Sequence, residues 1–121
     1  MGIPGPLAEA LLLGRLLIAQ VPASAAYRLA GVIILPHRDE RDRRAQVEGR
    51  TPRLCDRRYL VLWREYSRRH MENDWDMVPG DGIWELKRTE VLGLQDLEDL
   101  LRSWSVSLAS LTYPWNTEIP E

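Results

Sequence analysis

Apolar and polar positions alternate in blocks along the chain, and each block predicts one element. Residues 7–21 are almost continuously apolar with one wholly apolar helical face, so they predict a helix that Pro22 ends. Residues 28–35 and 58–66 are rich in aliphatic and aromatic side chains and predict two strands. Between them, residues 37–57 have almost no apolar side chains, so we expect a long charged hairpin connection.

The second half of the chain predicts a strand, a helix and a short last strand. Apolar and polar side chains alternate over residues 83–91, which is typical of a half-buried strand. Residues 94–104 carry one stripe of leucines and predict an amphipathic helix. Residues 106–113 predict the last strand, and we expect the tail, residues 116–121, to fray.

These elements follow the order α-β-β-β-α-β in one domain over residues 1–115. This order predicts an α+β fold, with one mainly antiparallel sheet and helices packed on one face. The first helix is apolar around most of its circumference and must be buried on more than one side. Two arrangements satisfy this requirement: the helix lies under its own sheet, or it packs against a second copy of the chain.

Charge is divided unevenly along the 121 residues. Residues 1–70 hold 13 basic and 7 acidic side chains, a net charge of +6, whereas residues 71–121 hold 3 basic and 11 acidic side chains, a net charge of −8. Such an asymmetry governs association more than fold. The single cysteine excludes an intramolecular disulfide, and the apolar N-terminal run has neither the basic start of a signal peptide nor the length of a membrane span. We expect a cytoplasmic protein that binds no membrane.

No motif in the sequence specifies a reaction. An acidic loop over residues 74–85 has the outline of a calcium loop, but Val78 and Pro79 occupy positions that need an oxygen ligand and a glycine. Neither His37 nor His70 lies at zinc spacing from Cys55. A Ser-His-Asp arrangement stays open, although no nucleophile-elbow pattern is found. We therefore predict no catalytic residue, metal or cofactor.

Tryptophans and acidic side chains favour a non-enzymatic protein that works through protein–protein interaction. Exposed tryptophans beside acids are typical anchors for a partner. The acidic C-terminal half suits an inhibitor or immunity-type protein that covers a basic surface, or a self-assembling subunit that forms a homodimer or a larger oligomer. The predicted interaction residues are Asp74, Trp75, Asp76, Asp96, Asp99 and Trp115.

Nucleic-acid binding is the alternative function. The connection over residues 37–58 is rich in arginine and could enter a groove of DNA or RNA. Acidic residues are interleaved with these arginines, however, and each acid repels a phosphate backbone. The residues predicted for this alternative are Arg41, Arg43, Arg44, Arg50 and Arg53.

Overall fold

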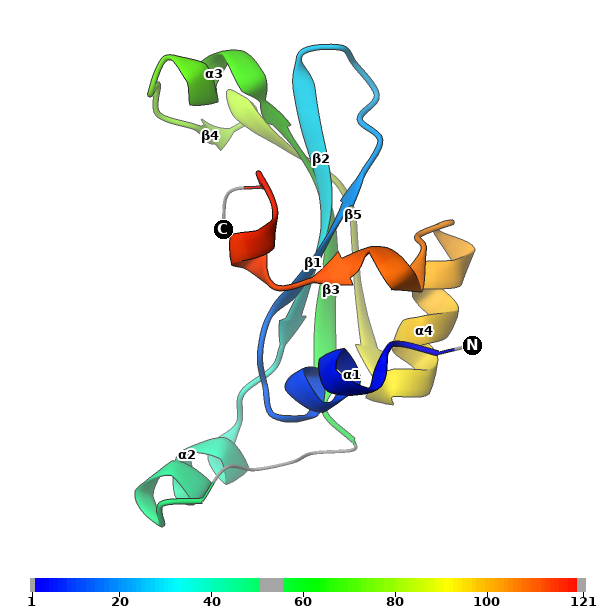
Figure 1. The fold of residues 1–121 in the computed structure, drawn as a ribbon. Coiled ribbons are helices and arrows are strands. Elements are labelled where there is room, and N and C mark those ends of the chain that lie inside the picture. The colour runs from blue at the N-terminus through cyan, green and yellow to red at the C-terminus, as the bar shows by residue number, and fades with distance from the viewer. Residues whose placement is uncertain (1, 51–55, 120–121) are drawn as a thin grey trace.

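The structure is a computed structural model that describes residues 2–50 and 56–119. Its helices are α1 (Gly5–Leu12), α2 (Glu40–Val47), α3 (Arg68–Glu72) and α4 (Gly93–Ser103), with 3-10 turns η1 (Leu108–Ser110) and η2 (Pro114–Asn116). Its strands are β1 (Leu17–Val21), β2 (Arg28–Pro36), β3 (Arg58–Ser67), β4 (Val78–Pro79), β5 (Gly82–Leu92) and β6 (Leu111–Thr112). They form one sheet in the order β4-β5-β3-β2-β1-β6 (Figure 1).

The three long strands confirm the central part of the predicted fold. β2, β3 and β5 are antiparallel neighbours and correspond to the strands predicted over residues 28–35, 58–66 and 83–91. Among the described strands, only the short pairing of β4 with β5 is parallel. The α+β class with a mainly antiparallel sheet is therefore confirmed.

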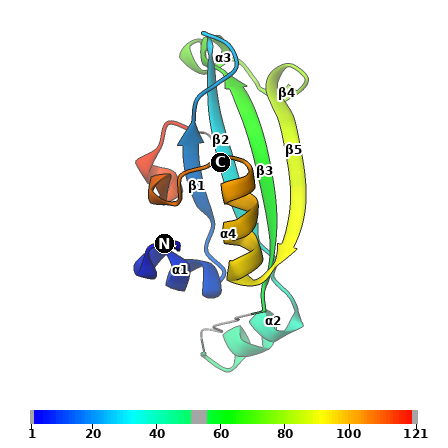
Figure 2. The same ribbon diagram turned by 90° about the vertical axis from the view of Figure 1, so that its right-hand side faces the viewer.

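One face of the sheet carries the main core, because α1 and α4 lie across it (Figure 2). Leu97 and Leu101 of α4 have 0 % exposure and belong to the same buried cluster as Val32, Ile34 and Val61 of the sheet. The amphipathic helix predicted over residues 94–104 is confirmed by this packing. A leucine stripe at helical spacing therefore located both the helix and its buried face.

The helix predicted over residues 7–21 is wrong in its second half. α1 ends at Leu12, Gly14 has a φ of 86°, and the chain then enters β1. A Cβ at Gly14 would lie 3.3 Å from Cζ of Arg57, so both the backbone conformation and the close approach favour glycine here. The first three residues of β1, Leu17–Ala19, are apolar and buried on both faces of the sheet, so they resemble a buried helix. Their burial requires no second copy.

The hairpin connection contains a helix that the sequence analysis missed. α2 buries a single side chain, that of Ala45, so it has no apolar stripe that could reveal it. Its start is fixed by a capping box: the Asp39 carboxylate accepts the backbone N–H groups of Arg41 and Asp42, and the Asp42 carboxylate accepts the N–H of Asp39. This cap is the sequence signal that predicts the helix.

The strand predicted over residues 106–113 is much shorter than expected. Only Leu111–Thr112 pairs with β1, because η1 takes up the preceding residues while their apolar side chains still pack on the core. The described part of the tail also differs from the expected frayed segment. Ile119 is 4 % exposed and lies over Gly31, where a Cβ would be only 3.0 Å from its Cγ1 atom.

Candidate functional site

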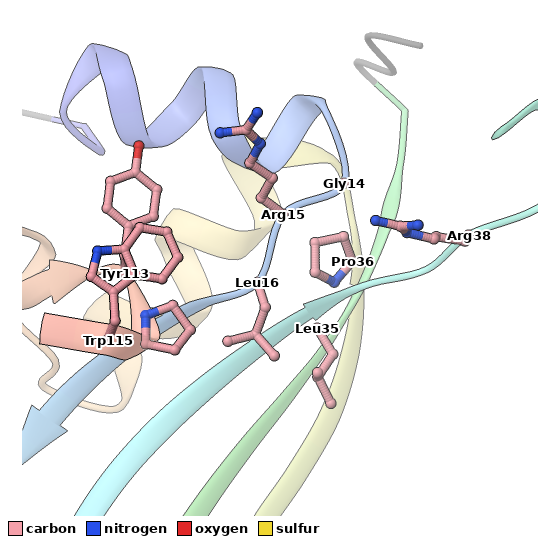
Figure 3. Close-up of a pocket in the computed structure, with 9 residues that line it drawn as sticks. Gly14, Arg15, Leu16, Leu35, Pro36, Arg38, Tyr113 and Trp115 are labelled. Atoms are coloured by element: carbon pink, nitrogen blue, oxygen red, sulfur yellow. The ribbon is translucent and has the colours of Figure 1, made fainter. Parts of the chain in front are cut away.

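The face of the sheet opposite α1 and α4 is covered unevenly. Met71 of α3 packs on one end, and Ile119 covers the middle. At the end next to α2, two hollows of about 550 and 360 Å³ share Leu35, Pro36 and Arg38. Figure 3 shows the residues that line the larger one. We call the two hollows together the basic groove, formed by residues 14–16, 35–38, 58–60, 90 and 113–115.

The floor of the basic groove is a row of leucines that crosses three neighbouring strands. Leu35 of β2 is in register with Leu60 of β3, and Leu60 is in register with Glu90 of β5. Leu16 immediately precedes β1 and lies beside Leu35 in the register of that strand with β2. All three leucines are half-buried, although they adjoin a fully buried cluster. An apolar row left open beside a core is typical of a docking surface.

Three arginines surround this floor. Arg15 precedes Leu16, Arg38 follows β2, and Arg58 begins β3; Figure 3 shows Arg15 and Arg38 on two sides of the larger hollow. Among the residues that the structure describes, none of the three has a carboxylate, carbonyl or aromatic partner. Of the remaining described arginines, Arg44 alone shares this property. The groove therefore carries uncompensated positive charge that attracts anions.

An aromatic pair forms the wall of the groove next to β6. Tyr113 and Trp115 are stacked with their ring centroids 4.8 Å apart and their planes 2° apart. Trp115 is 74 % exposed, so most of its indole is open to a ligand. Stacking on Tyr113 fixes the indole at little cost in conformational freedom, and exposed tryptophan is among the residues that contribute most to interfaces.

Arg57 fixes the two chain segments that lead into the groove. Its side chain is 1 % exposed, and its guanidinium donates to the carbonyl oxygens of Leu12 at 3.3 Å and His37 at 2.7 Å. It also forms two hydrogen bonds, of 2.8 and 3.0 Å, with the carboxylate of Asp42. The hydrogen bond from Arg57 holds the pKa of the Asp42 carboxyl below its usual 3.8. Both carbonyls lie shortly before rim arginines, so this buried contact sets the shape of the groove.

The structure does not bring the predicted protein-interaction residues together. Trp115 lines the basic groove, whereas Trp75, with Asp74 and Asp76 beside it, lies in the turn between α3 and β4 at the other end of the sheet (Figure 1). Asp96 and Asp99 are exposed on α4, on the opposite face. The acidic C-terminal half of the sequence is therefore distributed over several surfaces.

Most of the arginines predicted for nucleic-acid binding are neutralised by neighbouring acids. Arg41 pairs with Asp39 and Asp56, while Arg43 pairs with Glu40 and Arg50 with Glu48. Arg44 is exposed without such a partner among the described residues, and Arg53 lies outside them. These local pairs reduce the attraction of this segment for phosphates.

His70 contacts a serine and an aspartate in an arrangement that stabilises the local fold. Its Nδ1 lies 2.8 Å from Oγ of Ser67, and its Nε2 lies 3.1 Å from Oδ1 of Asp81. The Ser67 hydroxyl also accepts the backbone N–H of His70 as the N-cap of α3. Ser67 is 8 % exposed, so its hydroxyl caps a helix and is poorly placed to attack a substrate.

The three rim arginines were not predicted as one group from the sequence. They are separated by up to 43 positions, from Arg15 to Arg58, and only the register of β1, β2 and β3 places them together. The sequence did contain one signal for this group. Arg38 follows the strand predicted over residues 28–35 and Arg58 begins the strand predicted over residues 58–66, and a hairpin brings these two strand ends together. Arg15 lay inside the wrongly predicted helix and gave no such signal.

No protein-family model, curated protein or solved structure matches this chain. Within the described residues, no helix has both the length and the apolar character that crossing a membrane demands. Nor do the described residues bring three or more His, Cys, Asp or Glu side chains together as a metal site. The functional argument therefore rests on the geometry of the basic groove.

Proposed function

We propose that this protein is a non-enzymatic binding protein that docks an acidic segment of a partner protein in the basic groove. The observation that carries the proposal is the concentration of unpartnered arginines. Three of the four described arginines without an acidic, carbonyl or aromatic partner line the basic groove, Arg15 and Arg38 in its larger hollow and Arg38 and Arg58 in its smaller one. An acidic segment supplies the missing counter-charges, and its apolar side chains cover the open leucine row.

The composition of the groove favours an acidic peptide over a nucleic acid. Glu90 lies in the groove at the end of the leucine row, so it repels any anion at that end. A nucleic acid carries a phosphate on every nucleotide, whereas a peptide can place an uncharged residue opposite Glu90 and its acidic residues opposite the arginines. The leucine floor offers contacts to aliphatic side chains, which nucleic acids lack. The chain as a whole carries a formal charge of −2, whereas a nucleic-acid-binding face needs a broad positive field.

This proposal keeps the predicted class of function, protein–protein interaction, but assigns it to a positively charged surface instead of an acidic one. The sequence analysis expected the acidic half to cover a basic partner. The acidic residues of that half lie on separate faces, whereas the unpartnered basic residues converge. Docking through Asp96 and Asp99 of α4 stays a prediction that these observations do not address.

A peptide panel tests the proposal directly. We would measure fluorescence anisotropy of labelled ten-residue peptides that alternate Asp or Glu with Leu or Trp, beside matched peptides that carry Asn or Gln instead. We expect the acidic peptides to bind and the neutral ones to bind at least about tenfold more weakly, because two or more charge pairs are lost. Binding should weaken with added salt, which screens exposed charges.

Two double variants separate the groove from general charge effects. Arg15→Glu with Arg38→Glu reverses two rim charges, and we expect it to abolish binding of the acidic peptides. Arg43→Glu with Arg44→Glu makes the same change in net charge on α2, outside the groove, and should leave binding within about twofold of the wild type. Equal losses in both variants, or preferential binding of single-stranded oligothymidine, would contradict the proposal.

A further inference from the structure

An acidic and apolar turn lies at the end of the sheet away from the basic groove. We call residues 72–78 the acidic turn. Trp75 and Val78 expose 52 % and 50 % of their surface, which is unusual for large apolar side chains that are close together. Glu72, Asp74 and Asp76 are exposed and have no basic partner among the described residues. The turn therefore combines unpaired negative charge with exposed apolar surface.

The acidic turn is held in one conformation by its backbone. Asp74 has a φ of 53°, which places it in the left-handed region after α3. The N–H of Trp75 donates to the carbonyl of His70 at 2.9 Å, and the N–H of Asp74 to that of Met71, a pattern that commonly ends helices. The Trp75 indole also meets the His70 ring edge-on, with centroids 5.4 Å apart. The exposed indole is therefore presented in a fixed direction, which lowers the entropic cost of docking.

The acidic turn and the basic groove complement one another in charge and in apolar surface. We propose that the partner in the basic groove is a second copy of this chain, which inserts its acidic turn. This inference rests on the proposed function, because it names the occupant of that same groove. The carboxylates of Asp74 and Asp76 meet the rim arginines, and Trp75 covers the leucine floor. Each copy carries both halves of the contact, so the pair is self-complementary.

The positions of the two sites favour a closed two-fold dimer. Both lie on the face of the sheet opposite α4: Met71, just before the turn, and Met77, within it, pack on the same buried cluster that adjoins Leu35 of the groove (Figures 1 and 2). They are separated by six residues along β2, from Leu29 to Leu35, or about 20 Å at the usual rise of a strand. Two copies that face each other with antiparallel strands make both contacts at once, and the second contact is effectively intramolecular.

Sedimentation equilibrium of the full-length chain over a range of concentrations tests this arrangement. We expect a reversible monomer–dimer equilibrium. Asp74→Asn with Asp76→Asn should weaken dimerisation by about tenfold or more, since four carboxylate contacts are lost per dimer. Asparagine tolerates the left-handed conformation of position 74, so the variant keeps the fold. The matched control, Asp96→Asn with Asp99→Asn, removes the same charge from α4 and should dimerise like the wild type.

Mixing two defective variants provides the sharpest test. The Asp74→Asn/Asp76→Asn chain keeps an intact groove, whereas the Arg15→Glu/Arg38→Glu chain keeps an intact acidic turn. Neither can form a native contact with itself, but a mixed pair restores one of the two contacts. We expect heterodimers in the mixture at concentrations where each variant alone is monomeric. A Trp75→Ala chain, which keeps all charges, should also dimerise more weakly.

The outcomes separate this inference from the proposed function. Three results would overturn the closed two-fold dimer. They are a wild-type chain that stays monomeric at all concentrations, a dimer that all these variants leave unchanged, and assemblies larger than a dimer. Binding of acidic peptides to a monomeric wild type would still support the proposed function. A dimer that the groove variant leaves unchanged, together with acidic peptides that fail to bind at concentrations where the wild type is monomeric, would contradict the proposed function as well.

Discussion

Replacing Asp42 with alanine should destabilise the fold more than any other change of a single acidic residue on α2. Among the described residues, Asp42 is the one carboxylate that contacts Arg57, whose side chain is 1 % exposed. The substitution leaves this guanidinium buried, with the carbonyls of Leu12 and His37 as its remaining acceptors in the described part of the chain. It also removes the acceptor for the N–H of Asp39, and so opens one half of the capping box.

The expected magnitude follows from the cost of an unpaired buried charge. Removing one partner of a buried ion pair typically costs about 3–5 kcal/mol. Because Arg57 keeps two carbonyl acceptors, we expect the lower end, about 3 kcal/mol, for Asp42→Ala. Domains of this size have a free energy of unfolding of about 5–15 kcal/mol, so the variant loses a large part of its stability. Asp42→Asn keeps the shape and one acceptor and should lose less.

Urea denaturation followed by tryptophan fluorescence provides the measurement. With an m-value of about 2 kcal/mol/M, a loss of about 3 kcal/mol lowers the midpoint by about 1.5 M. Glu40→Ala on the same helix is the control, because Glu40 and Arg43 form an exposed pair whose loss costs at most about 1 kcal/mol. A loss for Asp42→Ala no larger than that of Glu40→Ala would refute the reasoning, since Arg57 would then need no counter-charge.

Two further predictions concern other contacts of the sheet. Burial by itself raises the pKa of the Glu65 carboxyl, but hydrogen bonds from Ser24 and Arg28 outweigh it and hold the pKa below its usual 4.5. The stability that Glu65 contributes is therefore present above pH 4.5 and lost as the pH falls through the depressed pKa, so Glu65→Gln should flatten the acid limb of unfolding free energy against pH. Gly31→Val should release the tail, because the added side chain occupies the place of Ile119; proteolysis near the C-terminus that is no faster than in the wild type would argue against this.

The sequence predicted the elements whose pattern is long enough or regular enough to be typical of one structure. β5 is half-exposed and α4 carries a leucine stripe, because one face of each meets the core. β3 is buried on both faces but forms a ten-residue strand rich in aliphatic and aromatic side chains. β1 has only five residues, and because Leu17–Ala19 are covered on both faces, they continue the apolar run of α1 and resemble a buried helix. α2 was not predicted for the opposite reason: it buries almost no side chain, and it is held in place by its N-terminal cap and by Arg57. Such tertiary contacts leave no periodic pattern in the chain.

The candidate site was predictable only in part. Trp115 stood out as an aromatic residue without an obvious place in the core, and it does line the groove. The leucine floor was hidden because Leu35 and Leu60 look like ordinary core positions of their predicted strands, and Leu16 like one of the predicted helix over residues 7–21. Whether such a row is covered depends on where the tail crosses the sheet, and Ile119 packs on the buried cluster that adjoins the row. Coverage by a distant segment cannot be read from local periodicity.

Arginine content is by itself a weak guide to function in this chain, because the structure gives this residue type three different roles. Arg57 is buried and hydrogen-bonded to Asp42, and Arg41 forms ion pairs with nearby acids on the surface. Arg38 has no partner among the described residues and lies beside an apolar floor. In the sequence all three belong to one charged segment and would contribute equally to a nucleic-acid-binding arm. The first two are already neutralised, so only the third adds to the field that an incoming ligand meets. The number of basic residues does not distinguish the groove from the rest of the basic half. The groove differs because its arginines have no partner among the described residues and lie beside an open apolar surface.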